Sequence, residues 1–575
     1  MLVLLALGAA AFFFFKVRRY LPERARGAEL APAETIFFAQ FPNLRQTALR
    51  VPKSDLYQIW LEPDMQTFLE KPRRKAPWMR AWAERIDEIL RAAPGECFVA
   101  VTSFADPRPS FVGGFSFAGN QRDAEALAIH FRAQVFSQVQ IVSAFRSNWY
   151  LCASDSEMLA ALLARFESKA GEALAATPIF QQSMAPLGVG QDLVLFGKPN
   201  ALSGNRDFLK ELGAPARTSA DDVIALATKI DGAKMHDTIF LRGSGAASAG
   251  TLSRQTLPLA SAQTLLYYAS ELSLLQPGGD LGMLKGLVPG LAGMEKSLAE
   301  KGLTWSDLPA AIGPEFGVMA EWPEDAVLPV VLLASEVRDA VKTRTFMDAL
   351  TNPPPPNSPW QREQRDGVTI MTAPAQGLSF VRPSAALTDR FALLGMSPEA
   401  VTAALSNTGK SAQPSLGQAV AFQDIARLVP DRASAFGYLD FPRLFERAYR
   451  MARPFITLSL AFSANAAAQI DAGKLPPVEA ISKHLGATVL TQTRIDGGTV
   501  IESIGSVTLP ELFLAIGAGG NAAGLPSLAG ALPGGTNKLA PQKPPRQPSS
   551  PIGVGGAAEN SAPSPSIPEK TRPQH

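Results

Sequence analysis

The fold is decided by a short apolar segment that reads Ala33-Glu34-Thr35-Ile36-Phe37-Phe38-Ala39-Gln40-Phe41-Pro42-Asn43-Leu44. Its β-branched and aromatic residues predict a strand, and the proline after them marks the change to a helical segment. The pattern returns at 262–269 and again at 435–444, where Phe441-Pro442-Arg443-Leu444 repeats the exit from the strand. A design that recurs along one chain indicates an internal repeat.

Other matches between the two halves of the chain indicate a tandem duplication. Glu96 and Glu315 each precede a strand-like run. A second set of matches has one constant separation of 242 positions: Glu157, Leu163, Leu174, Phe180 and Gln181 match Glu399, Leu405, Leu416, Phe422 and Gln423. The elements around them follow in the same order, and the turn Asp496-Gly497-Gly498 between alternating strands predicts a hairpin.

These observations predict an α+β fold with two similar domains, at residues 27–255 and 256–516. Each domain is expected to hold an antiparallel, curved sheet with amphipathic helices packed on one face, because strands joined by hairpins alternate with amphipathic helical patterns. The segment 517–575 is rich in Gly, Pro and Ser. It has too little apolar surface to offset the entropy of ordering, so we expect a disordered tail.

The composition argues against several classes of function. The chain has 575 residues with 54 Lys and Arg against 52 Asp and Glu, which gives no basic footprint for nucleic acid. Two cysteines cannot form a disulfide framework or a four-cysteine zinc site. The histidines are far apart, so we expect no metal and no cofactor: His130, His236, His484 and His575.

The first residues form an unbroken apolar run from Leu2 to Phe15, followed by a basic flank up to Arg26. A helix of this length reaches about 21 Å, less than the ~30 Å hydrocarbon core of a membrane. Three interpretations remain open, namely a membrane anchor, a cleaved signal peptide and a helix buried in the fold. We favour an anchor or signal-like segment at residues 1–26. The basic flank would keep the following residues in the cytoplasm, whereas basic residues upstream of the run would place them outside. We expect a periplasmic or other extracytoplasmic body.

Residues 54–90 combine aromatic side chains with helical spacing, including Trp60, Phe68, Trp78 and Trp82. They predict amphipathic helices that cover a sheet, with an aromatic binding surface as the alternative. Pro63, Pro72 and Pro77 are expected to divide the stretch into short helices. The basic run Lys71, Arg73, Arg74 and Lys75 is expected to be a solvated loop, and lipid headgroups are its alternative partner.

No motif for a known chemistry is complete. Thr408-Gly409-Lys410-Ser411 resembles a phosphate loop, but Ala404 stands where the first glycine belongs, so we expect a turn. The run 114–119 lacks the second glycine of a nucleophile elbow and reads as a strand. Cys97 and Cys152 are expected to be buried thiols, and a disulfide between them stays open.

Three segments carry a resemblance to a known class of proteins. They are Pro32-Ala33-Glu34-Thr35, Ser54-Asp55-Leu56-Tyr57-Gln58-Ile59-Trp60 and Pro63-Asp64-Met65-Gln66-Thr67-Phe68-Leu69-Glu70. With the apolar N-terminus and the repeated halves, the chain from Leu2 to Ile516 resembles uncharacterised bacterial envelope proteins of a domain-of-unknown-function type. The resemblance implies a body anchored by one N-terminal segment. It implies no catalytic residues.

We therefore expect a non-enzymatic, membrane-anchored envelope protein that acts by binding or scaffolding. The first alternative is a carrier of an apolar ligand or lipid in a cavity between sheet and helices. The second is a hydrolase that brings a nucleophile beside His130, His236 or His484 only in the fold. The expected partners are the membrane and either a protein or an apolar ligand.

Overall fold

The computed structural model describes residues 26–75, 95–104, 109–117, 121–122, 124–126, 129, 141–168, 172–199, 222–243, 251–271, 297–304, 307–352, 360–365, 367–374, 382–407, 414–429, 433–462, 471–508 and 510. The predicted N-terminal segment and tail lie outside these residues, as do Trp78, Trp82 and His130. Within the described ranges, no helix is both long enough and apolar enough to cross a membrane.

Strands and helices alternate through the first half. Its described strands are β1 (Phe37–Phe41), β2 (Cys97–Ser103), β3 (Ser110–Ser116), β4 (Val142–Arg146), β5 (Trp149–Ala153), β6 (Leu193–Gly197), β7 (Ile224–Asp231) and β8 (Lys234–Arg242). Its helices include α2 (Gly27–Leu30), α3 (Leu44–Arg50), α4 (Asp55–Leu61), α5 (Pro63–Lys75), α8 (Ser156–Ser168) and α9 (Pro178–Met184).

The second half is built in the same way. Its described strands are β9 (Leu266–Glu271), β10 (Ile312–Glu321), β11 (Val330–Val337), β12 (Gln361–Arg365), β13 (Val368–Thr372), β14 (Ser384–Leu387), β15 (Phe391–Gly395), β16 (Ala435–Leu439), β17 (Thr488–Ile495) and β18 (Gly498–Gly505). Its helices include the 3-10 turns η4 (Leu257–Leu259) and η8 (Ala472–Lys474), and α14 (Leu308–Ala311), α15 (Ala340–Thr351), α16 (Pro398–Asn407), α17 (Val420–Ala426), α18 (Phe441–Phe462) and α20 (Val478–Ser482).

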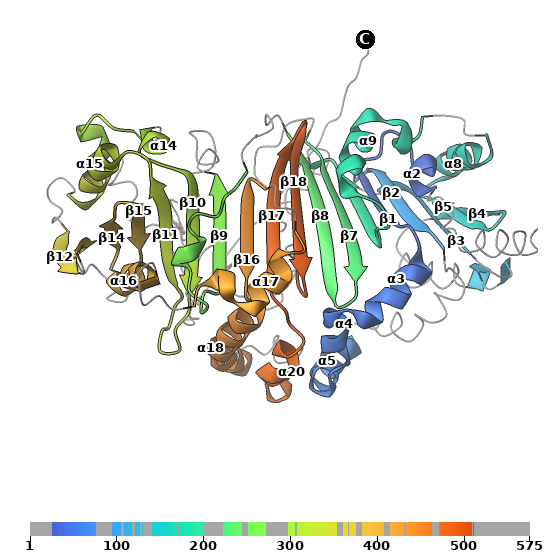
Figure 1. Cartoon of the computed structure of the whole chain (residues 1–575). Coiled ribbons are helices and arrows are strands. Elements are labelled where there is room, and N and C mark those ends of the chain that lie inside the picture. Colours follow the sequence, from blue (N-terminus) through green and yellow to red (C-terminus); the bar gives the residue numbers. More distant parts are fainter. Residues whose placement is uncertain are drawn as a thin grey trace, which may run out of the picture.

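All the described strands join one antiparallel sheet that crosses the molecule (Figure 1). From one edge, the first half follows the order β4, β5, β3, β2, β1, β6, β7, β8. From the other edge, the second half follows the order β12, β13, β14, β15, β11, β10, β9, β16, β17, β18. The predicted α+β class and antiparallel pairing are therefore confirmed, as is the hairpin at 496–498.

The two halves meet where β8 pairs with β18, from Met235 opposite Gly505 to Arg242 opposite Gly498. Close approach of the two backbones requires a glycine at position 498, because a Cβ there would lie 2.4 Å from the carbonyl oxygen of Leu241. The halves thus share one continuous ladder of backbone hydrogen bonds at the centre of the molecule.

Each half has its own apolar core, built around the strand of the organising segment. Phe38 on β1 is fully buried and meets Phe180 edge-on at 5.8 Å between ring centroids. Tyr267 on β9 is buried likewise, in a cluster with Phe422 and Phe436. Helices α8 and α16 pack on the sheet of their own halves and complete these cores.

Equivalent buried carboxylates lie beside the two organising strands. Glu96 Oε1 accepts a hydrogen bond from Gly27 N at 2.5 Å, and Glu315 Oε1 accepts one from Thr256 N at 3.4 Å. Burial raises the pKa of Glu96, although its hydrogen bonds act in the opposite direction. Each carboxylate holds the helical turn that leads into β1 or β9.

Two predictions for the helices are wrong. Pro72 does not end a helix, because α5 runs through it to Lys75. The run from Lys71 to Lys75, which we expected to be a loop, is therefore part of α5. A proline removes one backbone donor and bends the helix, but the turns on both sides of it can persist.

Candidate functional site

A cavity of about 160 Å³ lies in the second half, between the sheet and α16. The sheet contributes Met319 and Leu332, η4 contributes Leu259, and α16 contributes Ala400 and Ala404. These walls are apolar, and a cavity of about 150 Å³ with aliphatic walls can hold benzene. The space therefore suits one aromatic ring or the end of an alkyl chain.

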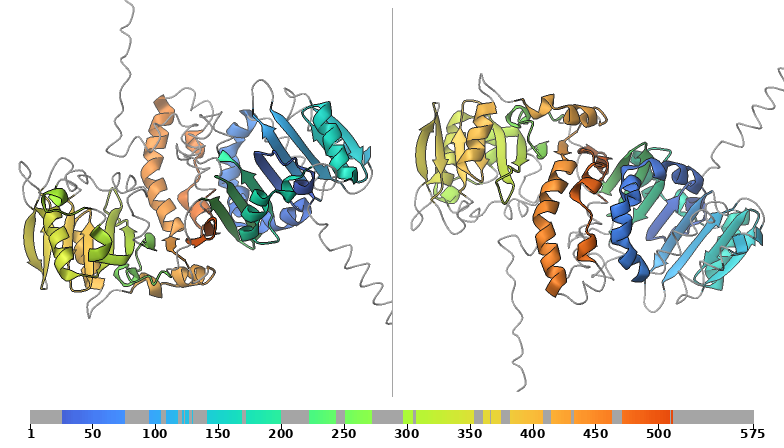
Figure 2. Two further views of the ribbon diagram at one scale, coloured as in Figure 1. Left: turned by 90° about the horizontal axis from the view of Figure 1, so that it is seen from above. Right: turned by 90° about the horizontal axis from the view of Figure 1, so that it is seen from below.

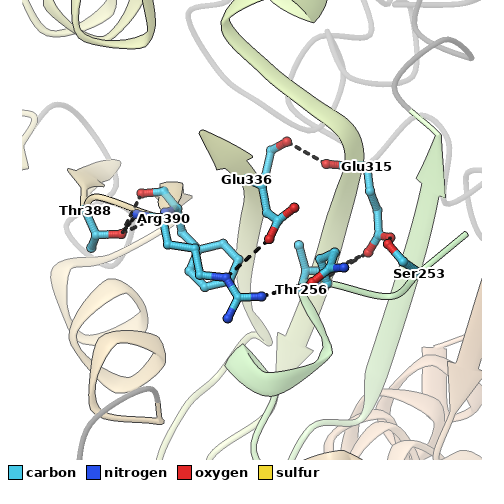
Figure 3. Close-up of polar contacts among 9 residues, drawn as sticks. Ser253, Thr256, Glu315, Glu336, Thr388 and Arg390 are labelled. Atoms are coloured by element: carbon cyan, nitrogen blue, oxygen red, sulfur yellow. Dashed lines mark hydrogen bonds and ion pairs between the residues drawn. The ribbon is translucent and has the colours of Figure 1, made fainter. Parts of the chain in front are cut away.

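The η4 wall of the cavity is fixed by the buried carboxylate of Glu315 (Figure 3). Glu315 Oε1 accepts hydrogen bonds from Thr256 N at 3.4 Å and from Thr256 Oγ1 at 3.3 Å. Glu315 Oε2 accepts one from Ser253 Oγ at 3.4 Å. The hydroxyl of Tyr267 lies 3.0 Å from Thr256 Oγ1, and burial raises its pKa, so it remains protonated. These contacts position a wall and leave no free nucleophile.

A second contact holds the approach to η4 from the other side (Figure 3). Arg390 donates from Nη2 to Gln255 Oε1 at 2.9 Å and from Nε to Glu336 Oε1 at 3.2 Å. Its guanidinium also lies 4.8 Å from the ring centroid of Phe391. Arg390 is largely exposed, and surface ion pairs contribute little stability, so this contact serves mainly to orient the segment before η4.

Helix α16 is held over the cavity by a hydrogen bond that the first half also makes. Asn407 Nδ2 donates to the carbonyl oxygen of Leu259 at 2.9 Å. In the first half, Arg165 Nε of α8 donates to the carbonyl oxygen of Leu30 at 2.8 Å. Arg165 and Asn407 have the same separation of 242 positions as the sequence matches. In each half, the helix is thus bonded to the helical turn that precedes the organising strand, α2 in the first half and η4 in the second.

The side chains under the two helices differ in size. At the same separation, Met158 and Leu162 of α8 correspond to Ala400 and Ala404 of α16. Leu162 is fully buried in the first core, and Met158 packs against it. Ala400 and Ala404 are small, and both line the cavity. Sequence reasoning did not identify these alanines, although the separation that it found would have shown the difference.

Two carboxylates, Glu321 and Glu399, are among the polar residues that line the cavity. Glu321 Oε1 accepts hydrogen bonds from Ser261 Oγ and, at 3.3 Å, from Thr264 Oγ1. Glu399 also lines the cavity, and its side chain is 73% exposed, so the cavity opens to solvent there. An apolar group can therefore enter while the rest of a ligand stays in water.

The two described histidines lie beside carboxylates that link the halves. His484 Nε2 is 2.6 Å from Glu62 Oε1, and Lys483 Nζ is 2.9 Å from the same oxygen. Their hydrogen bonds lower the pKa of Glu62. His236 Nε2 lies 3.5 Å from Glu502 Oε1 across the β8–β18 pairing. These contacts join the halves, and His130 lies outside the described residues.

The two cysteines are free thiols, so the disulfide alternative is wrong. Cys97 on β2 opposes Phe115 of β3, and Cys152 on β5 opposes Gly113 of the same strand. With β3 between them, β2 and β5 are about 10 Å apart, whereas a disulfide needs Cα atoms within about 7 Å. Burial raises the pKa of Cys97 to about 11 and that of Cys152 to about 12. Neither thiol is activated as a nucleophile.

The other sequence candidates fall partly in the described chain. Trp60 on α4 and Phe68 on α5 are half-buried. Gly114 and Ser116 belong to β3, which confirms the strand predicted there. The turn predicted at 408–411 lies outside the described residues. Among the residues that the structure describes, no three metal-binding side chains gather at one point.

Comparison with known proteins identifies no family for the chain. No protein-family model matches it, and no curated protein does. The solved structure of crystal form I of TP0453 aligns with 39% of this chain and 80% of that chain, at 14% identity and a TM-score of 0.21. A similarity at this level supports no conclusion about function.

Proposed function

We propose that the protein is a non-enzymatic, membrane-anchored envelope protein that acts by binding, and that its ligand places a small apolar group in the cavity under α16. The observation that carries the proposal is the replacement of Met158 and Leu162 by Ala400 and Ala404 at equivalent places. A retained space of about 160 Å³ with apolar walls favours a ring or an alkyl end as the bound group.

The proposal includes the architecture predicted from the sequence. Two similar domains, at 27–255 and 256–516, each with a curved sheet covered by amphipathic helices, would account for the shared strand order. The matching bonds of Arg165 and Asn407 also support a duplication. On this proposal one domain kept a filled core, and the other acquired the binding site.

Two other functions, a scaffold and a hydrolase, fit the structure less well. A pure scaffold has no need of the cavity, so we place it second. A hydrolase needs a nucleophile beside a histidine, whereas His236 and His484 lie beside Glu502 and Glu62. The membrane attachment and the extracytoplasmic location rest on the apolar run from Leu2 to Phe15.

The test is ligand binding by the full chain and by a filled variant. Native mass spectrometry of the purified chain, followed by solvent extraction, will identify a bound apolar molecule. Fluorobenzene binding, followed by ¹⁹F NMR, will test the cavity directly. We expect both signals to disappear in the double variant Ala400→Met and Ala404→Leu, which copies the first half.

The matched control is Val420→Leu, which enlarges an exposed side chain on α17. It should bind fluorobenzene as the unmodified chain does. Binding that survives in the filled variant would place the ligand elsewhere. Failure of the unmodified chain to bind either an extracted molecule or fluorobenzene would contradict the carrier proposal and favour the scaffold.

A further inference from the structure

Within the described part of the chain, helix α18 packs against α20 and η8. Tyr449 donates a hydrogen bond from its hydroxyl to the carbonyl oxygen of Pro476 at 2.6 Å, in the segment before α20. The ring of Tyr449 also stacks on that of Phe445, one turn earlier, with centroids 5.3 Å apart. Seen from below, α18 is a long helix that crosses beside the central strands (Figure 2).

Another face of α18 presents large apolar side chains to solvent. Met451 is 37% exposed, Phe455 is 66% exposed and Leu458 is 56% exposed. Their spacing of four and three residues places them on one stripe of the helix. Side chains of this size are seldom left in water as a contiguous stripe unless they meet a partner.

The same helix is strongly basic. Between Phe441 and Phe462 it carries Arg443, Arg447, Arg450 and Arg453, against a single acidic residue, Glu446. Arg447 and Arg450 pair with Glu324 at 3.0 Å and Glu479 at 3.7 Å, and both of these carboxylates are exposed. Arg453 has no carboxylate partner within the described part of the chain.

The arginines lie beside the apolar stripe. A shallow surface depression on α18 is lined by Arg450, Arg453 and Leu458 together with Pro454 and Thr457. Cationic heads beside an exposed apolar stripe are typical of helices that lie in the headgroup layer of an anionic membrane. The arginine stems allow the charges to reach phosphate groups while the apolar side chains enter the acyl boundary.

A second copy of the protein fits this surface less well than lipid does. In a twofold dimer the same patch meets itself, so the arginines of α18 would face one another. Like charges brought together in this way oppose association. An anionic lipid surface satisfies the charge and the apolar stripe together.

We propose that α18 docks on an anionic lipid surface, with Met451, Phe455 and Leu458 inserted and Arg450 and Arg453 on phosphate groups. This proposal is independent of the cavity and of the N-terminal segment. It assigns the body a second point of membrane contact and orients it with α18 against the lipid.

The test is hydrogen exchange of the full chain mixed with excess lipid nanodiscs, one set of pure phosphatidylcholine and one with phosphatidylglycerol added. Excess discs let α18 reach lipid whether or not residues 2–15 insert. We expect peptides that cover 450–458 to exchange more slowly with anionic discs than with neutral ones. Each of Arg450→Gln and Arg453→Gln should lower this protection about five-fold, since a basic residue near such a surface contributes about 1 kcal/mol.

The double variant Phe455→Glu and Leu458→Glu should abolish the protection. Both positions are exposed, so its unfolding transition should match that of the unmodified chain. Val341→Glu, at a 72% exposed position on α15, is the matched control and should leave the protection intact. Equal exchange with the two lipids would overturn the proposal. Protection that appears without lipid and rises with protein concentration would also overturn it, in favour of self-association.

Discussion

Replacing Ala404 with leucine should stabilise the second half of the protein, because the added carbons enter a space that already exists. Leucine adds three carbons, and burial of each stabilises by about 0.8 kcal/mol, which gives an upper limit of about 2.4 kcal/mol. Fixing the new rotamer costs about 0.5–1 kcal/mol. The expected gain in the free energy of unfolding is therefore about 1.5 kcal/mol.

The reciprocal change in the first half should have the opposite effect. Leu162 is fully buried in a cluster with Leu30 and Leu174. Truncation to alanine removes the same three carbons and leaves a cavity, which typically costs about 3–5 kcal/mol. The pair of variants therefore tests one structural claim, that position 162 is filled and position 404 is not.

Native-state hydrogen exchange is the suitable assay, because it reports the opening free energy of α8 and α16 separately in the full chain. Ala404→Leu should slow exchange in α16 and leave α8 unchanged, and Leu162→Ala should speed exchange in α8. A loss of more than about 1 kcal/mol in Ala404→Leu would indicate overpacking, and the cavity argument would then be refuted. If Leu162→Ala left the opening free energy of α8 unchanged, the claim that position 162 is filled and position 404 is not would be refuted.

Three further predictions concern titration and packing. Burial raises the pKa of Glu96, so protonated Glu96 stabilises the folded state below its unfolded pKa, and this stabilisation is lost as the pH rises through the folded pKa. Urea unfolding of Glu96→Gln between pH 4 and 7 should show no such loss. Burial raises the pKa values of Cys97 and Cys152 to about 11 and 12, so both thiols should react slowly with iodoacetamide at pH 8 in the native protein. They should react readily after unfolding. Equal rates in the folded and unfolded states would contradict the burial of these thiols. Gly498→Ala should destabilise the β8–β18 pairing by about 1–3 kcal/mol, because the added Cβ would meet the carbonyl oxygen of Leu241. The loss should appear as faster hydrogen exchange in both strands. Unchanged exchange would argue against the close approach of the two backbones at this position.

The strands with strong apolar patterns were predictable from the sequence. The run that follows Glu96 and the run at 435–439 appear as β2 and β16, since β-branched and aromatic residues bounded by turn signals leave little ambiguity. Strand β12 carries no such pattern, because Gln361–Arg365 is polar throughout and exposed. It becomes a strand through its pairing with β13, which no local propensity specifies.

Helix α18 shows a different limit of sequence reasoning. The exit Phe441-Pro442-Arg443-Leu444 indicated a helical start, but the helix continues to Phe462 through Pro454. A proline in this position reads as a helix end in sequence analysis. A proline removes one backbone donor and bends the helix, but the turns on both sides can persist. Tyr449, before Pro454, holds the helix to the segment before α20.

The cavity was the hardest feature to predict from the sequence, because it depends on small side chains at two positions and on no recognisable motif. Ala400 and Ala404 are good helix formers and carry no chemical group that a motif search recognises. Their small size is informative only when α16 is compared with α8, where Met158 and Leu162 stand 242 positions earlier. If the halves arose by the duplication proposed above, each half supplies the reference against which a change in the other can be interpreted.

The residue that holds α16 in place, Asn407, is not one of the alanines at positions 400 and 404 that leave space beneath the helix. Asn407 holds the helix to Leu259 just as Arg165 holds α8 to Leu30, so the helix keeps its place without a large side chain at position 404. An unfilled space forgoes stability that one substitution would restore. A ligand present at about one hundred times its dissociation constant would supply about 2.7 kcal/mol, which exceeds the gain expected from Ala404→Leu. On the proposed function, occupation by an apolar ligand would therefore offset the stability lost at the two alanines.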